Sequence, residues 1–233
     1  MNVYIWEEIP PLNFTANTAG STIKLKKNGS PTAVTLEIST DWTTWTTYTI
    51  WDTITLVNIW DKVYFRNTST TDTWFSTSSS NWYVFVMTWS IAWSWDINYL
   101  LNKNSTTTVS SYCYHGIFYN CTSLTTSPQL PATTLSNWCY AYMFSWCTNL
   151  TTLPKLPATT LADSCYYNMF YNCSKIKLST TQTWEYQTAY RIPTTWTWTT
   201  ATNALNSMFK NTWWTFTSDP SINTTYYTSN TVV

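Results

Sequence analysis

Glycine is scarce in this sequence, and its scarcity constrains how the chain can turn. The chain has 3 glycines in 233 residues, whereas glycine usually accounts for about 7% of residues. Tight turns need backbone positions with positive φ, which glycine adopts at little cost. Other residues must therefore occupy such positions wherever this chain turns tightly.

Charge and long apolar runs are scarce as well. Charged residues make up 9% of the chain, and 11 basic residues balance 11 acidic ones, so the net charge is zero. Without a basic field, nothing attracts nucleic-acid phosphates or anionic lipids, so we expect no nucleic-acid partner. No apolar run approaches the length of about 18 residues that indicates a membrane span, so we expect no membrane insertion.

The residues that usually carry catalysis or hold metals are few. The single histidine, His115, occupies a repeat position that Ala141 and Tyr167 fill in the sister copies, so it is not expected to be a catalytic base. The sequence has no Gly-rich phosphate loop, nucleophile elbow or HExxH helix, and no Asp-x-Asp-x-Asp calcium loop. We therefore expect a protein that is not an enzyme, with no catalytic residue, metal site or cofactor.

What the chain does contain is a 26-residue repeat. Residues 107–131, 132–157 and 158–183 align without internal gaps, and a degenerate fourth copy at 200–216 has lost both cysteines. Such a period is typical of stacked repeat units. We expect the recurring cysteines, phenylalanines and leucines to be structural anchors: Cys113, Cys121, Cys139, Cys147, Cys165, Cys173, Phe118, Phe144, Phe170, Leu124 and Leu150.

Apolar residues within each copy stand four apart, as Cys139, Met143 and Cys147 do. This spacing matches one face of a helix, so we predict a short helix of about three turns in each copy. The stretch after it, TNLTTLPKLP in the second copy, predicts a short strand and an extended turn. Because the cysteines recur on this helix face, we expect small buried hydrophobic residues rather than a disulfide framework or a zinc site.

Residues 12–93 show short runs in which apolar and polar residues alternate, as half-buried strands do. We expect such strands around Ile23 and Leu36 and at 46–50, 53–57, 62–66 and 82–91. Asn28-Gly29 predicts a hairpin between the first two of them. About seven short strands favour a small antiparallel sandwich, and the amphipathic stretch DINYLLNKN at 96–104 is expected to cap the first repeat.

These patterns together predict an α+β protein. It would have an N-terminal antiparallel β-sandwich and a short leucine-rich-repeat-like solenoid, with one short helix and one short strand per 26-residue unit. We expect the sandwich at residues 1–94, a capping helix or linker at 95–106, the repeats at 107–216, and a C-terminal cap or tail at 217–233.

The repeat resembles a known family. The segments IFYNCTSL (117–124) and MFYNCSKI (169–176) are similar to the bacterial surface-protein 26-residue repeat, a relative of the BspA-like leucine-rich repeats. The resemblance covers residues 107–216, and the segment that begins FTANTAGSTIKLKKNGSP is similar to β-sandwich modules found beside such repeats. The resemblance implies cell-surface or virion-associated binding without catalytic residues.

Aromatic residues are the candidates for a binding surface, because tyrosine and tryptophan supply large contact areas. Tyr114, Tyr140 and Tyr166 form one column in the repeats, and Tyr119 and Tyr171 form another. Core packing is the alternative for either column.

The function we predict is that of a cell-surface adhesion or receptor-binding module. Its partner would be a protein or glycan receptor on a host or neighbouring cell. The alternatives are a structural or receptor-binding phage component of a tail fibre or baseplate, and a carbohydrate-binding accessory module. All three would act outside the cell, on a cell surface or in a virion, although the start, MNVYIWEEIPPLNF, has no signal-peptide pattern.

Tryptophan is as abundant as glycine is scarce, with 17 residues. Many occur where turn residues are expected, as in TIWDTI, NIWDKV and PTTWTWTT, and Trp146 replaces the asparagine that its sister copies carry at Asn120 and Asn172. Glycine and asparagine are the residues that favour a left-handed conformation at such sites. Two hypotheses stay open: TGA codons that the source organism reads as glycine, and real tryptophans that form binding surface.

Overall fold

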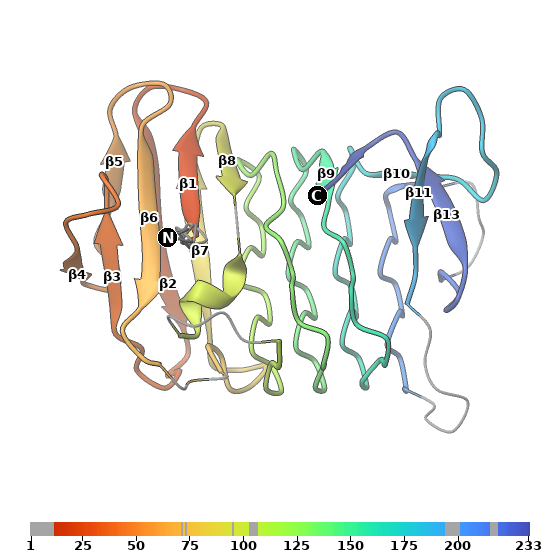
Figure 1. Cartoon of the computed structure of the whole chain (residues 1–233), viewed down its shortest axis with the longest axis horizontal. Coiled ribbons are helices and arrows are strands. Elements are labelled where there is room, and N and C mark those ends of the chain that lie inside the picture. The colour runs from red at the N-terminus through yellow and green to blue at the C-terminus, as the bar shows by residue number, and fades with distance from the viewer. Residues whose placement is uncertain are drawn as a thin grey trace, which may run out of the picture.

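The computed structural model describes residues 12–70, 72, 74–94, 96–102, 107–193, 201–214 and 219–233. Strands and turns dominate these residues, and their one helical element is the 3-10 helix η1 (Ile97–Leu100). Figure 1 shows two regions along the long axis, one made of sheets and one made of wavy layers. Several expected segments lie partly outside the described residues: 1–11, 71 and 73 of the sandwich, 95 and 103–106 of the cap, 194–200 and 215–216 of the repeats, and 217–218 of the tail.

The first region consists of two antiparallel sheets. Five strands have the order β4-β3-β6-β1-β8, and three have the order β5-β2-β7. Phe85 of the smaller sheet contacts Phe14 and Phe65 of the larger one at centroid distances of 4.8 and 5.5 Å, so the sheets pack face to face. The strands are β1 (Asn13–Ala16), β2 (Ser21–Asn28), β3 (Leu36–Ser39), β4 (Thr46–Tyr48), β5 (Ile54–Leu56), β6 (Lys62–Asn67), β7 (Trp82–Thr88) and β8 (Ile91–Ser94).

Alternating side chains explain why these residues form strands. In β2, Ile23 and Leu25 are buried, while the neighbouring Lys24 and Lys26 are partly exposed. Successive side chains of a strand point to opposite faces, so one face enters the core and the other stays in water. The strands expected around Ile23 and Leu36 and at 46–50, 53–57 and 62–66 are confirmed, whereas the run expected at 82–91 contains β7 and the start of β8.

The expected hairpin between β2 and β3 is wrong. β2 pairs with β5 and β7, whereas β3 pairs with β4 and β6 in the other sheet. Gly29, with a φ of 69°, does turn the chain after β2, but the turn leads from one sheet to the other. The Asn-Gly pair therefore identifies the turn correctly. Which strands pair with β2 depends on the side chains of segments that are distant in the sequence.

The second region is built of hydrogen-bonded turns. In the first repeat, the Cys113 N–H closes a four-residue turn by donating to the Ser110 carbonyl at 3.2 Å. The next N–H, that of Tyr114, instead donates to the Cys139 carbonyl in the following repeat at 2.8 Å. This alternation continues through the repeats, so each turn run forms a layer bonded to the next. We call residues 110–121, 136–147, 162–173 and 201–212 layers 1 to 4.

Every fourth residue of a layer has a positive φ. In layer 1 these residues are Tyr112, Gly116 and Asn120, with φ values of 58°, 61° and 60°. A right-handed helix of L-residues does not contain such positions. The backbone therefore rises and falls in short waves, which Figure 1 shows in the middle of the molecule.

The predictions of one helix per repeat, of an α+β fold and of a leucine-rich-repeat-like solenoid are therefore wrong. The described residues are mostly strand and turn, with antiparallel sheets, and their longest helix is the four-residue η1. The reason is the spacing of four residues between Cys139, Met143 and Cys147. It approximates the helical period of 3.6 residues, but it equals the spacing of the positive-φ positions in the layers.

Equivalent aromatic residues stack in columns inside the layers. Their rings are nearly parallel, with interplanar angles of 13° or less and centroids 5.1 to 5.9 Å apart. Equivalent rings stack on one another because backbone hydrogen bonds hold equivalent positions of successive layers side by side. The two columns are Tyr114, Tyr140 and Tyr166, and Phe118, Phe144, Phe170 and Phe209.

All six cysteines are buried and free, in agreement with the expectation of small buried residues. The thiol of Cys147 donates to the Phe118 carbonyl of the preceding layer at 3.0 Å. Burial raises the pKa of the Cys165 thiol to about 12, so the thiol keeps its proton in neutral solution. The leucine anchors Leu124 and Leu150 are also fully buried.

Strand β7 joins the two regions. The Phe85 N–H donates to the Ile117 carbonyl of layer 1 at 2.8 Å, and the Phe85 ring stacks on Phe118 at 5.7 Å. The η1 helix also contacts this layer, because the Tyr114 hydroxyl donates to the Ile97 carbonyl at 3.1 Å. The sheets and the layers consequently share one hydrophobic core.

Short strands complete the C-terminal part. Figure 1 shows two of them, β11 and β13, at the far end of the stack, and the C-terminus on the front of the layers. One pair is antiparallel, β11 (Thr188–Arg191) with β13 (Thr225–Thr228), and two pairs are parallel, β9 (Thr152–Leu153) with β14 (Thr231–Val232) and β10 (Lys177–Leu178) with β12 (Trp213–Trp214).

Candidate functional site

The outward side of the layers is the first candidate surface. Each turn run places side chains such as Cys113 and Phe118 in the core, while other positions, such as Tyr112 and Tyr119, lie at the surface. In layers 1 to 3 many outward positions carry aromatic residues that are half-buried or exposed. We call this set the outer aromatic face: Tyr112, Tyr119, Trp138, Tyr142, Trp146, Tyr167 and Tyr171.

Contacts between layers make much of this face continuous. The rings of Tyr112 and Trp138 are parallel, with centroids 6.0 Å apart. The ring centroids of Trp138 and Tyr167 are 5.4 Å apart, and those of Tyr167 and Tyr142 are also 5.4 Å apart. Backbone hydrogen bonds between layers fix the spacing of these rings, so the face is preorganised for contact with a partner.

His115 lies beneath this face and is 5% exposed. Its ring contacts Trp82 at 5.3 Å, Tyr142 at 5.4 Å and Tyr112 at 6.0 Å. Burial lowers its pKa from 6.5 to about 4, because the charged imidazolium would lose its water. Histidine is therefore neutral at pH 7 and serves here as a flat ring that supports the outer aromatic face.

The first predicted tyrosine column is core rather than surface. Tyr114, Tyr140 and Tyr166 are at most 1% exposed. Burial raises the pKa of each hydroxyl well above its ordinary value. These side chains stack on one another inside the layers, so they do not present a binding surface.

The second predicted column does lie outside. Tyr119 is 41% exposed, and Tyr171 is half-buried and contacts the 44% exposed Trp146 edge to face at 6.1 Å. Sequence reasoning missed the other outward aromatics, including Tyr142 and Tyr167. A strict period of four, with the anchor cysteines inside, would have placed them on the opposite side of the turn run.

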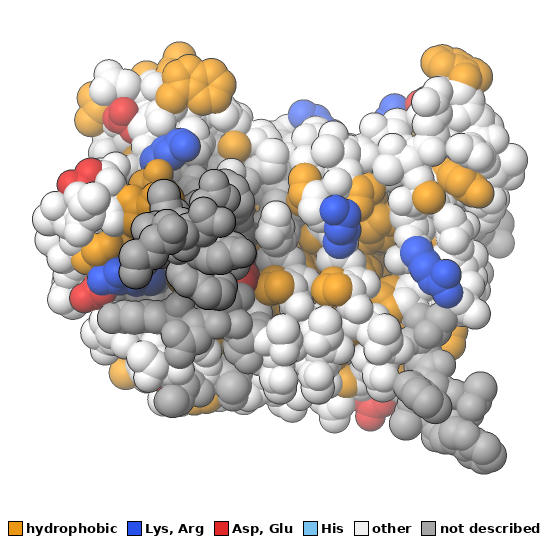
Figure 2. All heavy atoms as spheres, in the orientation of Figure 1, with side chains coloured by type: hydrophobic (Ala, Val, Ile, Leu, Met, Phe, Trp, Pro, Cys, Tyr) orange, Lys and Arg blue, Asp and Glu red, His pale blue; other side chains and the backbone are white. Residues whose placement is uncertain are grey.

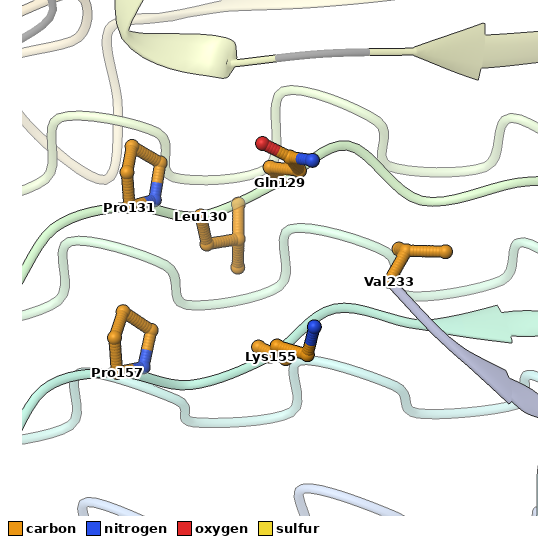
Figure 3. Close-up of a pocket in the computed structure, with 6 residues that line it drawn as sticks. All are labelled: Gln129, Leu130, Pro131, Lys155, Pro157 and Val233. Carbon is orange, nitrogen blue, oxygen red and sulfur yellow. The ribbon is translucent and has the colours of Figure 1, made fainter.

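The front of the layers carries a second candidate, a shallow groove of about 250 Å³. Figure 3 shows that it lies between two equivalent extended segments, one from each of two successive repeats, with the C-terminal residue near both. Lys155 supplies an ammonium group beside the prolines and Leu130. The lining residues are Gln129, Leu130, Pro131, Lys155, Pro157 and Val233.

A second groove of about 290 Å³ lies on the other side of Lys155. It is bounded by the segment 155–157, by Val232 and by β11, where Tyr190 and Arg191 contribute to its lining. Figure 2 shows this face of the molecule as largely uncharged, with isolated basic side chains and scattered hydrophobic ones over the layers. The grooves offer apolar contact and a few cations, but no continuous aromatic surface.

No family model, no curated protein and no solved structure matches the chain. Within the described residues, no three or more metal-binding side chains gather into a group. No helix in that part of the chain is long and apolar enough to cross a membrane.

Proposed function

We propose that this protein is a non-enzymatic binding module that docks a protein or glycan receptor through its outer aromatic face. One observation carries the proposal: outward positions of three hydrogen-bonded layers carry half-buried or exposed tyrosines, and the ring centroids of Tyr142 and Tyr167 in neighbouring layers lie 5.4 Å apart. The resemblance of the repeat to bacterial surface-protein repeats supports the same function. The proposed site of action is a cell surface or a virion.

Tyrosines suit this role because they give large contact areas and a polar hydroxyl with few rotatable bonds. Layer-to-layer hydrogen bonds hold their backbones, so little conformational entropy is lost on binding. The low charge of the chain means that contact area and hydrogen bonding supply the affinity, without long-range charge steering. The layers also allow outward residues to vary while the inward anchors stay constant.

The test is a triple variant in which Tyr119→Ser, Tyr142→Ser and Tyr167→Ser remove tyrosines from all three layers. The matched control is Tyr186→Ser, because Tyr186 is half-buried in the loop before β11 and lies outside the outer aromatic face. Circular dichroism first verifies that both variants fold. Binding is then measured on a glycan array and on cells of candidate hosts.

The proposal predicts that the triple variant loses about 100-fold or more in affinity, because hot-spot tyrosines contribute about 1–2 kcal/mol each. The control should bind like the unaltered protein. Loss on the glycan array identifies a sugar, and loss on cells alone identifies a protein receptor. Unchanged binding by a folded triple variant would refute the proposed role of this face.

A further inference from the structure

Within the described residues, six tryptophans occupy backbone positions that suit glycine. Their φ values lie between 60° and 85°, and all three glycines of the chain also have positive φ. A positive φ is uncommon for any L-residue and is an outlier for a bulky one. The six are Trp42, Trp51, Trp60, Trp89, Trp138 and Trp146.

Two of these residues lie in tight turns of the sheet region. Trp51 is the third residue of a four-residue turn that the Asp52 N–H closes on the Thr49 carbonyl at 3.0 Å. Trp60 has the same place in the turn that Asp61 closes on Asn58 at 3.3 Å. A positive φ at this position is the signature of a type II turn, where glycine or asparagine normally occurs.

The layers give an internal comparison. Trp146, with a φ of 66°, is the third residue of the turn closed by the Cys147 N–H and the Phe144 carbonyl at 2.9 Å. The equivalent residues of layers 1 and 3 are Asn120 and Asn172, with φ values of 60° and 59°. Three copies therefore share one conformation, and the middle copy has the side chain least compatible with it.

Three of the six indoles are mostly exposed, so burial offsets little of this strain. Trp51, Trp60 and Trp89 are 53%, 73% and 66% exposed. Trp93 is the opposite case: it is 3% exposed, has no positive φ, and packs edge to face on Phe14 at 4.3 Å. Trp93 thus occupies a buried site that accommodates an indole, whereas the six tryptophans with positive φ occupy backbone conformations that favour glycine.

We propose that the protein made by its source organism carries glycine at these six positions, because TGA codons in the gene are read as glycine rather than tryptophan. The proposal reduces the imbalance in composition, because six replacements change 17 tryptophans and 3 glycines into 11 and 9. It also changes the surface. The exposed indoles at Trp60 and Trp89 disappear. The outer aromatic face loses Trp138 and Trp146 and keeps its tyrosines, among which Tyr142 and Tyr167 remain in contact.

The deciding experiment reads the codons and measures the masses of peptides from the protein isolated from its source. The proposal predicts TGA at all six codons, and peptides lighter than the printed sequence by the difference between a tryptophan and a glycine residue. TGG codons at these positions, or peptide masses that match tryptophan, would overturn it.

A second experiment tests the structural reasoning on recombinant protein. A variant with glycine at all six positions should melt at a higher temperature than the printed chain, by roughly 5–10 °C, since positive φ no longer strains a β-carbon. The control Trp93→Gly should melt lower, because it empties a core site. A lower melting temperature for the six-glycine variant would show that the six indoles stabilise the fold despite their positive φ.

Discussion

The sheet region and the layer region bury the same kinds of residue in different geometries. In the sheets, Phe14, Phe65 and Phe85 come from three unrelated strands and meet edge to face, at interplanar angles of 61° to 81°. In the layers, Phe144 lies nearly parallel to Phe118 and Phe170, at 4° and 13°. The period of the sequence makes the difference, because a repeat places identical side chains at identical backbone positions and a sandwich does not.

Removal of one ring from a layer should have the largest effect on stability. Phe144→Ala deletes a fully buried ring that contacts its equivalents in both neighbouring layers. We expect the free energy of unfolding in urea to fall by about 3–5 kcal/mol. Hydrogen exchange should accelerate in layers 1, 2 and 3, because each layer is bonded to the next.

The sheet counterpart is Phe65→Ala, which removes an equally buried ring. It should cost a similar free energy, but its effect on exchange should centre on the sheets. If Phe144→Ala costs less than about 1 kcal/mol, or if both variants perturb the same segments equally, the contrast between the regions is wrong.

Acid should weaken the layer region through His115, where burial lowers the pKa from 6.5 to about 4. The imidazole of His115 binds a proton more readily in the unfolded chain than in the folded one. The free energy of unfolding is therefore unaffected by this group above pH 6.5, and it declines as the pH falls toward 4. The shift corresponds to about 3 kcal/mol in all. His115→Ala, which copies Ala141 of the next layer, should lose less stability between pH 7 and pH 4.5 than the unaltered protein does.

This measurement can be made without interference from Asp41 in the sheet region. Hydrogen bonds from the backbone N–H groups of Thr44 and Thr43 lower the pKa of Asp41. The contribution of the ionised Asp41 to the free energy of unfolding is therefore lost only below the ordinary pKa of the carboxyl, 3.8. That pH lies outside the range measured. Equal acid losses in the unaltered protein and in His115→Ala would contradict the role of the buried imidazole.

The smallest expected effect comes from the strained turn positions. Trp146→Asn restores the residue that Asn120 and Asn172 supply in the sister layers, and it should raise the free energy of unfolding by about 1 kcal/mol. The reverse change, Asn172→Trp, should lower it by a similar amount. Thermal or urea unfolding measures both. A Trp146→Asn variant that is less stable would show that the indole packs usefully.

The sequence predicts the sheet region better than the layers because alternation has one structural meaning and a spacing of four has two. The alternation around Ile23 and Leu25 identifies a strand, although no local pattern reveals that this strand pairs with β5 and β7. The spacing from Cys139 to Cys147 fits both a helix and a series of turns. Left-handed residues would have distinguished them, but glycine, the usual marker, is present in the layers only at Gly116.

The candidate surface was predicted in part for the same reason. Tyr119 and Tyr171 lie outside in the structure, and Tyr114 does not. On a helix, residues i and i+3 share a face, so a helical interpretation places Tyr142 on the same inward face as Cys139. In the layers the period is four, and Tyr142 is half-buried at the surface although it lies three residues after the buried Cys139.

The most direct test of the layer architecture is the hydrogen bond of the Tyr114 N–H. Scalar couplings across hydrogen bonds, measured by NMR on labelled protein, identify the carbonyl that accepts each amide proton. We expect a coupling from Tyr114 to the Cys139 carbonyl in the next layer, where the donor–acceptor distance is 2.8 Å. A coupling from Tyr114 to the Ser110 carbonyl, four residues earlier as in an α-helix, would contradict it.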